Sequence, residues 1–267
     1  MDSTNPPEDI APFKEEEQEG AVGHENARHA FFATAVPSVA NLARVAEPLG
    51  DLRDRIVFIG GAIAPLLQTH PPFPRVRPTK DVDGVIASSS YLEANKVHEE
   101  LALRGFRHDT TSTAHVHRWI APDHITLFDL IPAGSHPGGS GNPWDQLAID
   151  TADVYELYSG LQIRHATAPA FLALKWSAHR DRGLHDPRQS HDLEDLLALI
   201  ASRPTLVTEV QRSPEQLREF IRQQADELLN DPDIDELFES HLNNAPSRRE
   251  VVRAVRATLI ELAQKER

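Results

Sequence analysis

The fold is decided by two short segments, Phe58-Ile59-Gly60-Gly61-Ala62 and Arg77-Pro78-Thr79-Lys80-Asp81-Val82-Asp83. The first continues an apolar run that starts at Ile56, which predicts a short buried strand ending in a two-glycine turn. The second predicts a strand whose two carboxylates, Asp81 and Asp83, share a face, because side chains two residues apart point the same way. Neighbouring carboxylates repel each other unless a cation lies between them. The pair therefore indicates a site for magnesium ions, which prefer oxygen ligands.

A third carboxylate, Asp129, interrupts the apolar segment Leu127-Phe128-Asp129-Leu130-Ile131. A buried aspartate needs a partner, so a strand here would add it to the site; alternatively, Asp129 begins a turn before Pro132. Three carboxylates on adjacent strands are typical of metal-assisted displacement at a phosphate. Gly60 and Gly61 would let the backbone approach a triphosphate, with amides at the following helix start donating hydrogen bonds to it. Each signal alone is weak, because Gly-Gly turns and surface Asp-x-Asp sequences are common.

The rest of the pattern predicts an α+β fold, a mixed sheet flanked by helices and followed by a helical C-terminal domain. Helices are expected over 37–49, over 90–104 with a stop at Gly105, and from Pro169 onward. Strands are expected over 56–59, 81–86, 116–120 and 125–131, around Phe106, and as a pair within 155–166. Residues 132–143 are expected to be a Gly- and Pro-rich loop. The predicted units are an acidic disordered tail over 1–26, an α/β domain over 27–166 and a helical domain over 167–267.

Composition limits the chemistry. The chain has 267 residues, a net charge of −14 and no cysteine, which excludes disulfides, a thiolate nucleophile and Cys-ligated metal sites. The acidity is concentrated in residues 1–26, with eight acids and one lysine, and in 207–240, with ten acids and three arginines. It therefore does not exclude a nucleic-acid partner. The first residues lack the order of a signal peptide and no apolar run could cross a bilayer, so we expect a cytoplasmic protein without a membrane partner.

These segments resemble the DNA polymerase β-like nucleotidyltransferases, and most closely their AbiEii-type abortive-infection and toxin–antitoxin branch. The resemblance covers about residues 50–200 and is carried by Gly60-Gly61-Ala62, Arg77-x-Thr79-x-Asp81-x-Asp83, Asp129, Lys175 and His191-Asp192-Leu193-Glu194-Asp195-Leu196. It implies Mg²⁺-dependent transfer of a nucleoside monophosphate from a nucleoside triphosphate (NTP) to an acceptor hydroxyl, with pyrophosphate leaving. The acceptor would be an RNA end, a protein or a small molecule. In the toxin branch, an antitoxin would be a further partner.

The resemblance also implies residue roles. Asp81 and Asp83 would hold two Mg²⁺ ions, and Asp129 would bind the catalytic ion and help deprotonate the attacking hydroxyl. The helical domain would complete the nucleotide site. The nucleotide-binding residues would be Gly60, Gly61, Ala62, Thr79, Lys175 and Asp192.

Some of these residues also have a purely structural interpretation. Lys175 shares a helical face with Phe171, so its ammonium is expected to point inward, but a lysine at the edge of such a face can reach solvent. Asp192 follows Ser190, an expected N-cap, and is either a site residue or a first-turn acid favoured by the helix dipole. Arg180 and Arg182 either contact phosphate or pair with neighbouring acids, Asp181 and Asp186.

The sequence departs from the family at Ala62, where many relatives have a serine whose hydroxyl meets phosphate. The gap between Gly61 and Asp81 is also longer than in the smallest members, and Pro71-Pro72-Phe73-Pro74 occupies part of it. An active enzyme and a catalytically silent nucleotide-binding or regulatory module of the same fold are both compatible with the motifs. A third hypothesis is an HD-type metal phosphohydrolase, which would use the histidine-containing segment 179–192. Those folds are all helical, whereas this chain has a strand-rich half.

Overall fold

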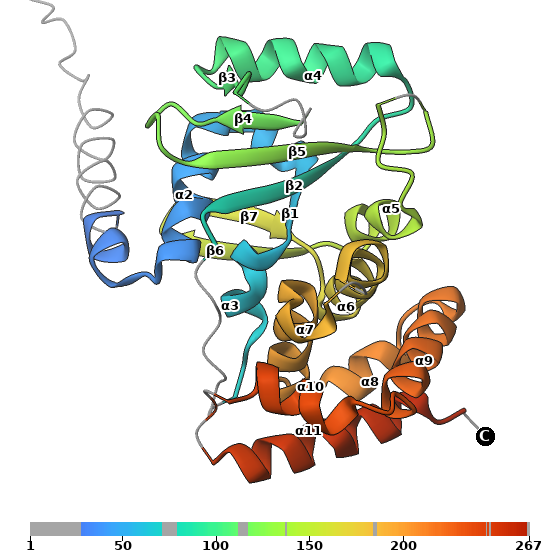
Figure 1. Ribbon diagram of the computed structural model, residues 1–267. Helices are drawn as coiled ribbons and strands as arrows, with labels where there is room; N and C mark the ends of the chain where they lie inside the picture. The colour runs from blue at the N-terminus through green and yellow to red at the C-terminus, as the bar shows by residue number, and fades with distance from the viewer. Residues whose placement is uncertain are drawn as a thin grey trace, which may run out of the picture.

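A computed structural model describes residues 28–70, 79–111, 117–136, 138–183, 186–243, 245 and 247–265. The predicted tail over 1–26, the proline-rich stretch over 71–74, Arg77 and His185 lie outside these ranges. Within them the chain forms the predicted α+β fold, a mixed sheet flanked by helices (Figure 1).

The sheet has seven strands among the described residues, in the spatial order β3-β4-β5-β2-β1-β7-β6. β2 is parallel to β5 and antiparallel to β1, and β1 is parallel to β7. β3 and β4 continue the sheet beyond β5, and β6 pairs with β7 at the opposite edge. The strands are β1 (Ile56–Ile59), β2 (Asp81–Ala87), β3 (Arg107–His108), β4 (Arg118–Ile120), β5 (Leu127–Ala133), β6 (Asp153–Tyr158) and β7 (Leu161–His165).

The central strands follow from their side chains. Every residue of β1 is buried, as expected for a strand covered on both faces. β2 alternates, so that Val82 is buried while Asp81 and Asp83 are only partly buried on the other face. β5 continues through Pro132 to Ala133. The alternative that Asp129 begins a turn is therefore wrong, and the predicted loop over 132–143 starts too early.

Ten α-helices and four 3₁₀ or π turns lie wholly within the described ranges. They are α2 (Pro37–Leu49), α3 (Ala64–Leu67), α4 (Tyr91–Leu103), α5 (Pro143–Asp150), α6 (Ala168–Ala178), α7 (His191–Ser202), α8 (Leu206–Gln211), α9 (Glu215–Leu229), α10 (Ile234–His241), α11 (Arg248–Ala263), η1 (Gly50–Arg55), η2 (Gly61–Ile63), η3 (His179–Gly183) and η4 (Pro187–Gln189). No helix in the described part of the chain combines the length and apolarity that a membrane span needs.

Local capping signals set the helix boundaries. The Ser190 hydroxyl accepts from the Leu193 amide at 3.3 Å and caps α7, as predicted. Gly105 follows α4 with φ of 85°, the left-handed conformation in which helices commonly end. α5 was not expected from the sequence. It begins with a capping asparagine, Asn142, followed by Pro143 at the first helical position, which is a recognised start signal.

The C-terminal helices gather at one end of the sheet (Figure 1). α6 packs against α7, and α8, α9 and α11 pack onto this pair. α6 is buried nearly all round, from Ala168 to Trp176, so it forms the centre of this helical part. This packing holds the first turn of α7 and the last turns of α6 near the N-terminal end of β2.

The close packing around Gly84 predicts that a larger residue at this position lowers the stability of the fold. A Cβ atom there would lie 3.0 Å from Cγ2 of Ile56 and 3.1 Å from Cε2 of Phe128, because neighbouring strands approach from both sides. We expect Gly84→Ala to lower the free energy of unfolding by about 1–3 kcal/mol through overpacking, measured by urea denaturation. Adding Phe128→Leu should relieve part of the overlap, so the double variant should lose less than the sum of the single losses. Strict additivity would contradict this origin.

Candidate functional site

Strand register brings the predicted carboxylates together. Asp83 pairs with Asp129 across the parallel β2–β5 ladder, and Arg118 pairs with Asp129 across the antiparallel β4–β5 ladder. Paired residues on adjacent strands point to the same face, and Asp81 joins them because it lies two residues before Asp83. Three carboxylates and one guanidinium therefore occupy one face of three adjacent strands.

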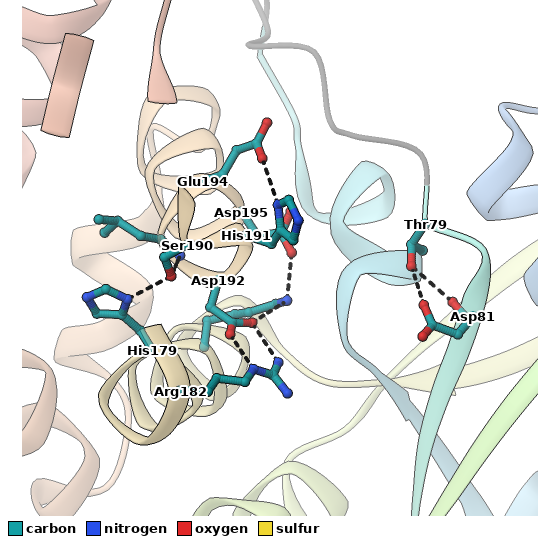
Figure 2. A network of polar contacts seen from close by, with 11 residues as sticks. Thr79, Asp81, His179, Arg182, Ser190, His191, Asp192, Glu194 and Asp195 are labelled. Atoms are coloured by element: carbon teal, nitrogen blue, oxygen red, sulfur yellow. Dashed lines mark hydrogen bonds and ion pairs between the residues drawn. The ribbon is translucent and has the colours of Figure 1, made fainter. Parts of the chain in front are cut away.

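This face opens into a cavity of about 450 Å³. The cavity contains most of the predicted site residues, together with several that the sequence analysis did not select. Its lining consists of Gly61, Thr79, Asp81, Asp83, Arg118, Asp129, Lys175, Arg182, Gln189, Ser190, His191, Asp192 and Asp195. β2, β4 and β5 form one wall, and α6, η3 and α7 form the other. Figure 2 shows the α7 residues facing Thr79 and Asp81 across this space.

The glycine turn has a different role at each position. Gly60 has φ of 71°, and a Cβ atom there would overlap the Asp83 carboxylate, so only glycine lets Asp83 lie against the turn. Gly61 lines the cavity. Ala62 is 0% exposed and packs in the core, so its side chain cannot meet a nucleotide. A contact with a nucleotide at this position could only be made by the backbone, so the assignment of Ala62 to the nucleotide site stays a prediction.

Arg118, which was not predicted as a site residue, neutralises part of the negative charge of the three aspartates. Its Nε and Nη2 donate to the two oxygens of Asp129 at 2.8 and 2.6 Å, and Nη2 also donates to Oδ2 of Asp81 at 3.3 Å. The other oxygen of Asp81 accepts from the Thr79 hydroxyl at 2.6 Å. An arginine at the start of a short strand gives no sequence signal by itself. Its pairing with Asp129 follows only from the register between β4 and β5.

Asp83 has a different environment. Among the described residues no donor forms a hydrogen bond or ion pair with its carboxylate, because Arg118 is directed at the other two aspartates. Burial, followed by repulsion from Asp81 and Asp129, raises the pKa of Asp83 to about 7. The charges of Lys175 and Arg182 offset only part of this effect, so an ionised Asp83 is costly unless a cation is supplied.

Lys175 lies on the helical wall and is only 8% exposed. Its ammonium forms ion pairs with Asp195 at 2.6 Å and Asp192 at 3.1 Å. Burial opposes the charged lysine, but the two carboxylates outweigh it and raise the pKa of Lys175. The inward orientation predicted for Lys175 is confirmed, and the alternative in which it reaches solvent is wrong. Asp195 was not predicted as a site residue, although its spacing of three from Asp192 places both side chains on one helical face.

Asp192 is both a first-turn acid of α7 and a cavity residue, so its two interpretations are not exclusive. Its carboxylate accepts from Nε and Nη2 of Arg182 at 2.8 and 3.1 Å (Figure 2). Burial works against the charge, but Arg182 and Lys175 hold the pKa of Asp192 below its usual range. Arg182 therefore pairs with Asp192 and not with Asp181 or Asp186, the neighbours suggested by sequence. The Arg182 side chain remains 72% exposed and faces the cavity.

The described histidines do not form the centre that an HD-type phosphohydrolase needs, and His185, on which that hypothesis also depends, lies outside the described residues. Nδ1 of His179 lies 2.8 Å from the Ser190 hydroxyl, whereas His191 is exposed and lies 3.6 Å from Glu194. Within the described ranges, no group of three or more His, Cys, Asp or Glu side chains is arranged to hold a metal ion. For the strand carboxylates, the reason is that the Arg118 guanidinium lies between Asp129 and Asp81.

The unpaired carboxylate predicts a pH effect in the presence of a chelator. Because the folded protein binds a proton at Asp83 more tightly than the unfolded chain does, stability falls as pH rises from about 4 to 7 and then levels off. Asp83→Asn should abolish this loss and be more stable than wild type at pH 8, by up to about 4 kcal/mol. Thermal and urea unfolding between pH 4 and 8 measure the difference. Asp150→Asn, the same substitution on an exposed helix end, is the control and should follow wild type.

The Lys175 ion pairs predict a second effect on stability. Lys175→Met leaves Asp195 buried without its cation, and we expect a loss of about 3 kcal/mol in the free energy of unfolding. The double variant Lys175→Met/Asp195→Leu removes the stranded charge and should recover part of the loss, measured by urea denaturation. A double variant as unstable as the single one would mean that the ion pair is not the cause.

Comparison with known proteins gives limited information. No family model and no curated protein matches the chain. Among solved structures the chain is similar to the crystal structure of JHP933 from Helicobacter pylori, with 16% sequence identity, a TM-score of 0.38 and 92% of each chain covered.

Proposed function

We propose that the cavity is the active site of a Mg²⁺-dependent nucleotidyltransferase with the polymerase β-like fold. The enzyme transfers a nucleoside monophosphate from an NTP to an acceptor hydroxyl. The observation that carries this proposal is Asp83, a carboxylate placed beside two others by strand register and bound by no donor among the described residues. Packing alone does not require this arrangement, whereas a cation-binding site does.

The donor set fits Mg²⁺. Asp81, Asp83 and Asp129 offer six carboxylate oxygens on one face, and hard divalent cations prefer such oxygens. Bound cations would neutralise the phosphate and stabilise the charge that develops on it during displacement. Asp81 and Asp83 would then hold the cations, and Asp129, on the strand next to β4, would bind one of them and accept the proton of the attacking hydroxyl.

The charge of the cavity also supports a metal-bound substrate. Its lining includes five aspartates against three cationic side chains, Arg118, Lys175 and Arg182. This balance repels a free triphosphate, whereas two divalent cations would reverse its sign. The nucleotide therefore binds together with its cations.

The opposite wall supplies groups for the triphosphate. Lys175 has three N–H donors and uses two of them on Asp192 and Asp195, which leaves one for a phosphate oxygen. Arg182 is fixed on Asp192 through one edge, while most of its guanidinium remains exposed. Thr79 and the backbone at Gly61 lie on the strand side of the same space.

The second candidate is a catalytically silent nucleotide-binding or regulatory module of the same fold. Arg118 favours it, because a guanidinium bound to Asp129 and Asp81 supplies within the protein the positive charge that a metal would bring. Both candidates bind a nucleotide at the helical wall of the cavity, but only the first transfers a nucleoside monophosphate from it.

A transfer assay separates them. The wild-type protein, incubated with each α-labelled NTP, Mg²⁺ and an extract containing RNA, proteins and small molecules, should move label to an acceptor and release pyrophosphate. Asp83→Asn should reduce the rate by at least about 100-fold, and EDTA should abolish it. Asp150→Asn, which lies outside the cavity, should retain the wild-type rate. Tight nucleotide binding without labelled product from any NTP would instead support the silent module.

A further inference from the structure

Arg118 is held in place more firmly than a surface arginine. It lies directly opposite Asp129 in the antiparallel β4–β5 pair, so the backbone sets its distance from that carboxylate. Only 14% of its side chain is exposed. The guanidinium binds Asp129 through two parallel hydrogen bonds, which is the strongest geometry for this pair.

The same oxygens are the ones that a divalent cation needs. Arg118 engages both oxygens of Asp129 and one of Asp81, and Thr79 engages the other oxygen of Asp81. A divalent cation bound to these oxygens would lie within a few ångströms of the guanidinium, where two positive charges repel strongly. Asp83 is the exception, because no described donor occupies it.

We propose that Arg118 is the resident counter-ion of the carboxylate site, and that a divalent cation reaches Asp129 and Asp81 only by displacing its guanidinium. This inference rests on the proposed function, since it requires a site that binds such a cation. The incoming cation first meets Asp83 and then exchanges with Arg118 at Asp129. The exchange weakens the binding of free metal and keeps the three carboxylates compensated when no substrate is present.

Binding of Mn²⁺ alone, without nucleotide, tests the proposal. The free Mn²⁺ signal in electron paramagnetic resonance gives the dissociation constant for wild type and for each variant. We expect Arg118→Met to bind Mn²⁺ at least about tenfold more tightly than wild type, because the competitor has gone. Arg118→Lys keeps the charge but cannot form the two-pronged contact, so it should fall between them; it also serves if the methionine variant fails to fold.

Arg182→Met is the matched control. It removes one positive charge from the same cavity but from a guanidinium that pairs with Asp192 and contacts none of the three strand carboxylates. A general field effect would strengthen Mn²⁺ binding in both variants, whereas displacement strengthens it much more in Arg118→Met.

Each outcome decides a different point. If wild type binds Mn²⁺ and Arg118→Met binds it no more tightly than wild type or Arg182→Met, the counter-ion role is overturned and the proposed function stands. If neither wild type nor any Arg118 variant binds Mn²⁺, the counter-ion role is overturned, and the transfer assay alone decides the proposed function. Tighter binding confined to the Arg118 variants supports the exchange.

Discussion

The repulsion between Asp83 and Asp129 is the constraint on which the site depends. Parallel pairing of β2 with β5 fixes these two carboxylates side by side, and Asp81 follows because side chains alternate along a strand. No local adjustment can separate them, since a shift of one residue in register would expose the apolar residues of both strands. The surrounding structure must therefore supply positive charge, and it does so unequally.

Two separate groups of charges result. On the sheet, Arg118 compensates Asp129 and part of Asp81, and no donor among the described residues binds Asp83. On the helical wall, Lys175 and Arg182 compensate Asp192 and Asp195 completely enough that the pKa of Asp192 stays low despite burial. The helical group is a stable frame that presents donors to the cavity, whereas the sheet group is under-compensated. Under the proposed function, a cation would be held from the sheet side and the anionic ligand from the helical side.

Much of the fold and part of the site could be predicted from sequence because they depend on local patterns. α2 and β1 agree with the expected ranges. Ser190 begins α7 and Gly105 follows the end of α4, as expected. The shared face of Asp81 and Asp83 follows from alternation alone. Arg118 could not be found in this way, because its role depends on β4 pairing with β5 in one register. The role of Asp195 could not be predicted because it depends on Lys175 pointing towards α7. The burial of Ala62 could not be predicted either, because a family motif does not say which of its side chains face inward.

Gly60 has a consequence for how this chemistry could be lost during evolution. Any other residue at that position would meet both an unfavourable left-handed backbone and the space already filled by the Asp83 carboxylate. A single codon change would therefore displace the Asp83 carboxylate while every aspartate remained in the sequence. Under the proposed function, a protein could thus keep all three aspartates and still be inactive, so the glycine has to be inspected together with the acids.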